Sequence, residues 1–255
     1  MAEIHLSFAG AGFMGIYHLG ACAALLQNGR ALLARVRGYA GASAGALVAT
    51  VLLTSPENLS SANKFLMELS QNVRNQPIGA ITPGFDFRAR LREGIEQLLL
   101  SNAHETADGR LFVSITNAWS GRNELVSRFS SRDELITVLE ASSFIPFYVG
   151  LEPVRYRDQL WLDGGLSNNL PLLPGGRTIT ISPFSGDHDV SPREADLRAI
   201  YARISRENFQ VSVCNAIRAA LAVLPPPQCV MEQIYERGEK DTVRFLRSNG
   251  FYQEE

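Results

Sequence analysis

The sequence predicts an α/β fold with three layers, in which helices flank a mainly parallel central sheet and a helical extension follows. Two glycine-rich turns, at residues 10–15 and 41–45, each follow a strand-like run and precede a helix-like run. Further strand-like runs alternate with helical stretches as far as residue 181, which is typical of parallel βαβ units. The 255 residues are enough for one such domain.

The first part of the chain contains two strand–turn–helix units. Apolar and polar residues alternate over 4–8 and predict the first strand, whereas apolar residues at helical spacing over 16–26 predict a helix that ends at Asn28-Gly29. Residues 36–40 predict the second strand, and 44–53 predict the helix that follows it. Because parallel strands end at the same edge of a sheet, both glycine-rich turns are expected at that edge.

The remaining elements are predicted from shorter patterns. Helices are predicted over 57–75, 87–98 and 131–141, strands over 111–116, 124–129 and 178–181, and a hairpin over 154–162. After Pro183 we expect only helices. A capping box at 191–194 is expected to open helices that run to Leu224, and two short helices are expected after the prolines at 225–227.

The composition argues against several classes of protein. A net charge of −2 gives no footprint for nucleic acid. Cys22, Cys214 and Cys229 are too far apart for a disulfide framework or a metal site, which favours a reducing, cytoplasmic compartment. The stretch 6–26 has no Lys, Arg, Asp or Glu, but no basic residue precedes it and glycines interrupt it. We therefore expect neither a signal peptide nor a membrane span.

The central motif is Gly41-Ala42-Ser43-Ala44-Gly45, which reads G-x-S-x-G. On a sharp turn from strand to helix, small neighbours let a serine project its hydroxyl at a helix N-terminus, where the dipole favours developing negative charge. Ser43 is therefore a candidate nucleophile, and Gly41 and Gly45 are the glycines of its turn. The alternative is a tight turn of small residues in which the serine has no role.

Gly10-Ala11-Gly12-Phe13-Met14-Gly15 spells G-x-G-x-x-G, the fingerprint of a dinucleotide site. Such a site needs an acidic residue about twenty positions further on, and no Asp or Glu lies between Glu3 and Glu57. Arg35 or Arg37 could hold the phosphate of NADP, so an NADP-binding oxidoreductase stays an alternative. We favour a different use of the loop, in which glycines let backbone N–H groups approach an oxyanion.

A serine nucleophile needs a base, and two arrangements are open. Asp163 ends a predicted strand directly before Gly164-Gly165. In a Ser–Asp–His triad, the only histidine after Asp163 is His188, which we expect at the surface in a polar turn. In a dyad, Asp163 takes the proton itself, which requires that burial raise its pKa above the usual value of about 3.9. An Asp-Gly turn without chemistry is the remaining alternative.

These three motifs, in this order, resemble the patatin-like phospholipase family, and the similarity runs through nearly the whole chain. It is most evident for the animal branch that includes adipose triglyceride lipase and its short relatives. Further matching stretches are residues 4–10, 142–146, 182–186 and 241–246.

The resemblance implies a patatin-like fold with a catalytic domain over 1–183 and a helical extension over 184–255 packed on it. It implies hydrolysis of lipid esters, mainly triacylglycerol, without a metal or nucleotide cofactor. The short relatives also suggest phospholipase, retinyl-ester hydrolase and acyl-transfer activities. The implied catalytic residues are the dyad of Ser43 and Asp163. The implied residues of the oxyanion hole and the glycine motifs are Gly10, Ala11, Gly12, Gly15 and Ala44, with Gly41 and Gly45 in the nucleophile turn and Gly164 and Gly165 after the base.

The resemblance also suggests where the protein acts. We expect a cytoplasmic protein that associates peripherally with membranes or lipid droplets, where its lipid ester substrate lies. An activating protein is a further expected partner, whereas nucleic acid is not. The apolar loop 76–87 contains several prolines and glycines, and it either packs on the core or acts as a lid that contacts lipid. The alternative outside catalysis is a lipid-binding protein.

Overall fold

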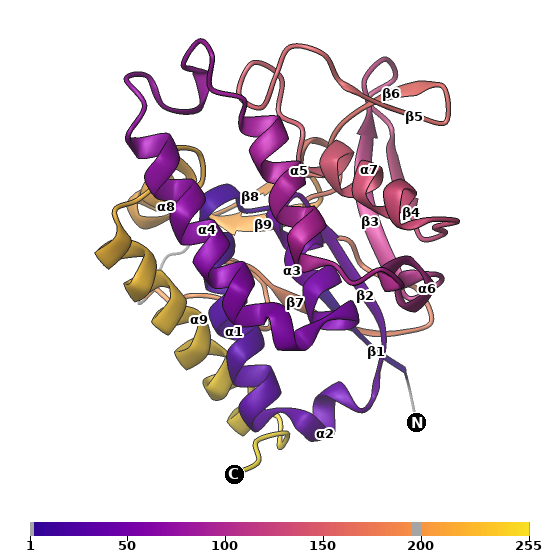
Figure 1. Cartoon of the computed structure of the whole chain (residues 1–255). Helices are drawn as coiled ribbons and strands as arrows, with labels where there is room; N and C mark the ends of the chain where they lie inside the picture. The colour runs from indigo at the N-terminus through magenta and orange to yellow at the C-terminus, as the bar shows by residue number, and fades with distance from the viewer. Residues whose placement is uncertain (1–2, 195–199, 255) are drawn as a thin grey trace.

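The computed structural model describes residues 3–194 and 200–254 around a seven-stranded sheet (Figure 1). The hydrogen-bonded order is β5-β6-β3-β2-β1-β7, and β4 pairs with β3 off this path. β1, β2, β3 and β7 are parallel, whereas β4 and β6 run antiparallel to β3, so the predicted α/β class with a mainly parallel sheet is confirmed. The strands are β1 Glu3–Phe8, β2 Val36–Ala42, β3 Leu111–Asn117, β4 Asn123–Val126, β5 Val154–Tyr156, β6 Gln159–Asp163 and β7 Gly176–Ile181.

Two strands share one edge of β3. β2 pairs with the first part of β3 and β6 with its last part, while β4 pairs along the opposite edge. At the junction Ala42 of β2 lies opposite Ser114, and Asp163 of β6 lies opposite the next residue, Ile115. β2 and β6 therefore meet end to end beside β3, which brings the residue after Ala42 close to Asp163.

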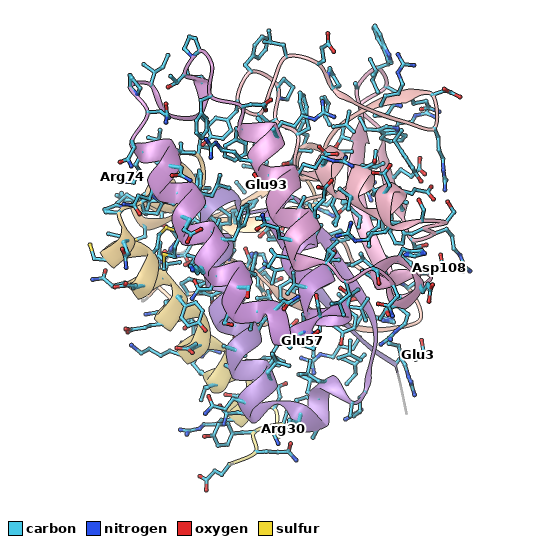
Figure 2. All side chains as sticks on the ribbon, in the orientation of Figure 1. Glu3, Arg30, Glu57, Arg74, Glu93 and Asp108 are labelled. Carbon is cyan, nitrogen blue, oxygen red and sulfur yellow. The ribbon has the colours of Figure 1, made fainter. Side chains whose placement is uncertain are left out.

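The helices cover the sheet in two tiers. α3 packs on β1, β2 and β3, and α7 packs on β3, β5 and β6. α4 and α5 lie outside these helices, in front of them in Figure 1, and exposed charges such as those of Arg74 and Glu93 lie on this outer tier (Figure 2). The helices of this part are α1 Gly15–Asn28, α2 Arg30–Leu33, α3 Ala44–Thr54, α4 Leu59–Arg74, α5 Phe87–Leu98, α6 Ala103–Ala107 and α7 Arg132–Ser142.

A β-hairpin stands where the sequence predicted only helix. β8 (Tyr201–Ile204) and β9 (Glu207–Gln210) pair in antiparallel fashion. The two turn residues, Ser205 and Arg206, have φ of 48° and 69°, a conformation that hairpin turns normally obtain from Asn-Gly or Asp-Gly. Because Ser-Arg is not a usual turn pair, no hairpin signal is present in the sequence, and the helix predicted over these residues was wrong. The predicted C-terminal helices follow the hairpin.

The other C-terminal elements also differ from the prediction. Residues 191–194 are not helical, so the capping box opens no helix there, and 195–199 lie outside the described residues. α8 (Val213–Val223) begins later than predicted. α9 (Gln228–Ser248) is one long helix instead of two short ones. No helix in the described part of the chain is both long and apolar enough to cross a bilayer.

α9 packs closely along α1. A side chain at Gly20 would collide with the backbone of Tyr235, so the two helices approach each other at a glycine. The buried carboxylate of Asp241 accepts a hydrogen bond from the Tyr17 hydroxyl at 2.9 Å and lies 3.0 Å from Arg237 Nε and 2.8 Å from an Arg244 nitrogen. The C-terminal part thus packs on the rest of the chain, while the boundary at residue 183 stays a prediction.

We expect Asp241→Ala to lower the free energy of unfolding by about 3 kcal/mol, because it leaves the partners of a buried charge unpaired. Tyr17→Phe removes one hydrogen bond and should lower it by about 1 kcal/mol. Urea unfolding at pH 7 measures both values. Equal, small losses in the two variants would show that Asp241 does not hold α9 against α1.

Candidate active site

Ser43 lies on a strained turn between β2 and α3. Its φ of 52° and ψ of −130° are rare for a residue with a side chain and are typical of a nucleophile held on a sharp turn. The Ser43 N–H donates to Ser142 Oγ at 2.9 Å, and Ser142 Oγ donates to the Ser114 carbonyl at 2.7 Å. Hydrogen bonds from α7 and β3 therefore hold the turn, a role for Ser142 that no sequence pattern indicated.

The glycines of the turn are required by close packing. A side chain at Gly45 would collide with the carbonyl oxygens of Phe8 and Ala9, and one at Gly41 would collide with the start of α3. These contacts let α3 begin directly over the ends of β1 and β2. The N-terminus of α3 thus lies beside Ser43, where its dipole favours negative charge.

Asp163 ends β6 and is fixed mainly by backbone contacts. Its N–H donates to the Phe144 carbonyl at 2.9 Å, and its own carbonyl accepts from Thr116 Oγ1 at 2.7 Å. Its carboxylate oxygen Oδ1 accepts from the Gly165 N–H at 2.7 Å. A side chain at Gly164 would collide with the Ser114 carbonyl, so this turn also needs its glycine. The residue is 4% exposed, and its carboxyl group therefore has a defined position in a dry environment.

Burial raises the pKa of Asp163 to about 6, although hydrogen-bonding interactions with the Ser43 side chain and the Gly165 N–H lower it. Removal from water disfavours the charged form of a carboxyl group, which makes it a stronger base. The Ser43–Asp163 contact lacks the geometry of a regular hydrogen bond, as is common in serine sites before a substrate tightens them. The structure thus brings the two predicted residues together.

The glycine-rich loop after β1 offers only some of the predicted N–H groups. The Gly10 N–H donates to the Asn169 carbonyl at 3.1 Å, and the Gly15 N–H bonds within the loop to Gly12 and Phe13. Neither Gly10 nor Gly15 therefore has an N–H left for an oxyanion. Both predictions overlooked hydrogen bonds that form only in the folded chain.

Other N–H groups near Ser43 remain available. Within the described residues, the N–H groups of Ala11, Gly12, Phe13 and Ala44 have no hydrogen-bond acceptor. Gly12 has a φ of 52°, which glycine adopts without strain. Phe13 carries no sequence signal for such a role, because every residue except proline supplies a backbone N–H. Unpaired N–H donors at a loop and at the start of a helix are what an oxyanion hole requires.

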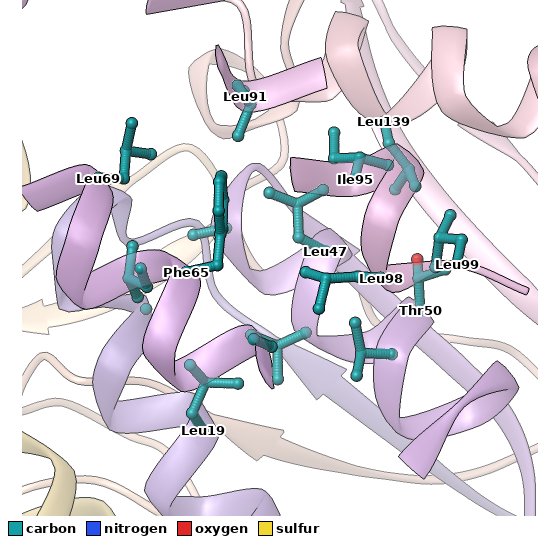
Figure 3. A pocket seen from close by; sticks show the side chains of 16 residues that line it. Leu19, Leu47, Thr50, Phe65, Leu69, Leu91, Ile95, Leu98, Leu99 and Leu139 are labelled. Carbon is teal, nitrogen blue, oxygen red and sulfur yellow. The ribbon is translucent and has the colours of Figure 1, made fainter. Parts of the chain in front are cut away.

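An apolar pocket leads away from Ser43 into the helical layer. Its lining includes Phe13, Ala44, Leu47 and Val223, and no charged residue is among its described lining residues. A second apolar pocket shares part of this wall and continues between α3, α4 and α5 (Figure 3). Sixteen residues line that inner pocket, and Thr50 is one of them. Its hydroxyl already donates to the Ala46 carbonyl at 2.7 Å. Apolar side chains thus form most of the wall of both pockets.

His188 does not lie at the surface, contrary to the prediction. Its side chain is 2% exposed, and its Nε2 lies 3.2 Å from Glu207 Oε1 of the hairpin, without hydrogen-bond alignment. The unpredicted hairpin covers it. The interactions of the Asp163 carboxyl group are with Ser43 and Gly165, and no histidine is among them in the described part of the chain.

Comparison with known proteins gives consistent matches. The family model for patatin-like phospholipases matches residues 6–175. Human patatin-like phospholipase domain-containing protein 4 is 51% identical over 253 residues, which cover 99% of this chain and 100% of that protein. Mouse patatin-like phospholipase domain-containing protein 2 is 38% identical over 246 residues, 96% of this chain and 50% of that protein.

Two further matches extend the comparison. The mouse protein named 1-acylglycerol-3-phosphate O-acyltransferase Pnpla3 is 36% identical over 245 residues, 96% of this chain and 59% of its own length. The chain thus spans only about half of this relative and of the mouse domain-containing protein 2. VipD from Legionella pneumophila matches in fold alone, with a TM-score of 0.51 and 13% identity over 97% of this chain and 67% of VipD. The family model and the identities show that this chain belongs to the patatin-like phospholipase family.

Proposed function

We propose that the protein is a serine lipid acyl hydrolase that acts through a Ser43–Asp163 dyad. The observation that carries this proposal is the buried carboxyl group of Asp163, with a pKa of about 6, beside a serine on a strained turn. Unpaired N–H groups and an apolar pocket adjoin the same serine. Relatives named as phospholipases or as an acyltransferase support lipid esters as the substrate class.

The reaction proceeds through an acyl-enzyme. Asp163 accepts the proton of Ser43 Oγ as this oxygen attacks the ester carbonyl, and the N–H groups of Ala11, Gly12, Phe13 and Ala44 stabilise the oxyanion. Asp163 then returns the proton to the departing alcohol. Water attacks the acyl-enzyme with Asp163 as base, and the fatty acid leaves. When another alcohol attacks in place of water, the outcome is acyl transfer.

The pocket favours neutral esters, and triacylglycerol is the substrate we propose. A phosphate headgroup needs a cation or a cluster of donors, and no charged side chain is among the described residues that line the pocket at Ser43. Retinyl ester is the neutral alternative, and phospholipid is the disfavoured one. Product analysis on these three lipids, with Ser43→Ala as blank, ranks them, and preferred release of fatty acid from phospholipid would contradict the proposal.

We propose that the protein acts at a membrane or droplet surface, because exposed apolar side chains lie on segments next to residues that line the pocket. Ile78 and Ile81 are 57% and 56% exposed on the loop 76–87, and Phe147 is 79% exposed. Phe147 has a φ of 68°, a strained conformation for an aromatic residue that persists only where its surroundings impose it. Phe85 of the same loop instead packs on the core, so only the exposed part of the loop is proposed to contact lipid.

The dyad predicts different effects for the two candidate bases. Ser43→Ala should abolish fluorophosphonate labelling, and Asp163→Asn should lower kcat on a soluble short-chain ester by about a thousandfold or more, because the amide cannot accept the proton. His188→Ala should lower kcat less than about tenfold, since a triad histidine would account for a far larger factor. A thousandfold loss in folded His188→Ala, judged by an unchanged melting temperature, would instead establish the triad.

The pH dependence of kcat/KM reports the base in the free enzyme. Asp163 must be ionised to accept a proton, and its pKa is raised to about 6, so kcat/KM should rise about tenfold per pH unit up to pH 6 and then level off. A soluble neutral ester avoids titration of the substrate. A flat profile between pH 4.5 and about 7 would contradict an aspartate base with a raised pKa.

Loss of lipid contact should affect emulsions more than soluble substrates. Replacing both Ile78 and Ile81 with serine should lower activity on triacylglycerol emulsions about tenfold while activity on a soluble ester changes less than about twofold, because about 100 Å² or more of apolar contact is lost only at an interface. Leu100→Ser, at the opposite end of α5, is the matched control. Equal losses on both substrates would refute this lid and lipid-contact role.

A further inference from the structure

The carboxyl group of Glu207 is buried behind the glycine-rich loop and takes no part in the proposed reaction. It comes from β9 of the unpredicted hairpin, drawn in light orange near the centre of Figure 1, and its side chain is 0% exposed. One oxygen accepts from Asn169 Nδ2, and the other accepts from Ser182 Oγ at 2.7 Å. Burying a carboxyl group is unfavourable unless it is well hydrogen-bonded, so the burial of Glu207 calls for a structural or functional explanation.

Asn169 connects Glu207 to the glycine-rich loop. Its Nδ2 also donates to the Gly10 carbonyl at 3.4 Å, and its backbone carbonyl accepts from the Gly10 N–H at 3.1 Å. Its Oδ1 fills the space that a side chain on Gly10 or Gly165 would need. The Asn169 side chain is therefore wedged between the loop that supplies oxyanion donors and the turn that follows Asp163.

The hairpin holds Asn169 at two places. Besides the contact with Glu207, the Asn169 N–H donates to the Ser205 carbonyl in the hairpin turn at 3.0 Å. The Ser205 hydroxyl donates to the Leu166 carbonyl at 3.1 Å, which lies in the segment between Asp163 and Asn169. The hairpin thus fixes both the backbone and the side chain of Asn169.

Holding the Gly10 carbonyl determines where the next N–H points. The Gly10 carbonyl and the Ala11 N–H belong to one planar trans peptide, so they point in opposite directions. When Asn169 binds the carbonyl, the Ala11 N–H is directed away from Asn169, and it has no acceptor within the described residues. Oxyanion donors act through preorganisation, and a misplacement of about 1 Å lowers rates by roughly 100-fold.

We propose that Glu207 is a positioning residue for the oxyanion hole. By accepting a hydrogen bond from Asn169 it orients the Gly10–Ala11 peptide, so that the Ala11 N–H is ready for the oxyanion. The role rests on the proposed hydrolase function. Glu207 touches neither Ser43 nor Asp163 in the hydrogen bonds of the described residues, so it acts only through Asn169 and the loop.

The test compares Glu207→Ala with the conservative Glu207→Gln on a soluble ester. The value of kcat is divided by the amount of protein whose serine a fluorophosphonate labels at completion, so that only folded sites are counted. Glu207→Ala should lower kcat about 10- to 100-fold with KM changed less than about twofold, because the lost interaction acts only in the transition state. Glu207→Gln should stay within about threefold of wild type, since its amide oxygen can still accept from Asn169. Glu105→Ala, which removes an exposed glutamate of α6, is the matched control.

Asn169→Ala keeps the proposal testable when Glu207→Ala folds poorly. It should lower kcat to a similar extent. The double variant should lose no more kcat than the more damaging single variant, because both residues act through one contact. Unchanged kcat per labelled serine in Glu207→Ala, additive losses, or equal damage in Glu207→Gln would each overturn the role. Wild-type protein that neither hydrolyses esters nor labels would contradict the proposed function itself, and the positioning role with it.

Discussion

The active site depends on the way β2 and β6 share one edge of β3. β2 turns away from the sheet at Ser43, and β6 occupies the place beside β3 that β2 leaves, with Asp163 opposite Ile115. Backbone ladders therefore fix the positions of two residues that are far apart in the sequence. The hydroxyls of Ser142 and Thr116 then hold the backbone of the two residues, and preorganisation of this kind is what efficient catalysis needs.

The burial that makes Asp163 reactive also affects stability. Its pKa in the folded protein, about 6, lies above the value in an unfolded chain. At a pH between these two pKa values, the folded state therefore binds the proton more tightly than the unfolded chain does. Stability contributed by this group is present at low pH and is lost as pH rises through about 6, where the folded protein must hold a buried charge. A rise of about two pKa units corresponds to roughly 3 kcal/mol. Basicity and stability are therefore opposed at this position.

Local patterns predicted most of the catalytic part. Period-two and helical spacings located the strands and the longer helices up to β7, whereas the short helices α2 and α6 were not predicted. The small residues around Ser43 indicated its turn because the required conformation is local. The features that the sequence missed depend on distant partners. The Gly10 N–H is occupied by Asn169, and His188 is buried by a hairpin whose turn, Ser205-Arg206, lacks the usual residues. Local spacing carries no information about such long-range contacts.

The end-to-end meeting of β2 and β6 also sets when the two residues of the proposed dyad can come together during synthesis. The ribosome completes the nucleophile turn first, and 120 residues separate Ser43 from Asp163. At 5–20 residues per second, about 6 to 24 s pass before the base is made. Through that interval the emerging chain carries Ser43 without Asp163, so the order of the strands along the sequence delays assembly of the proposed dyad until most of the domain can fold.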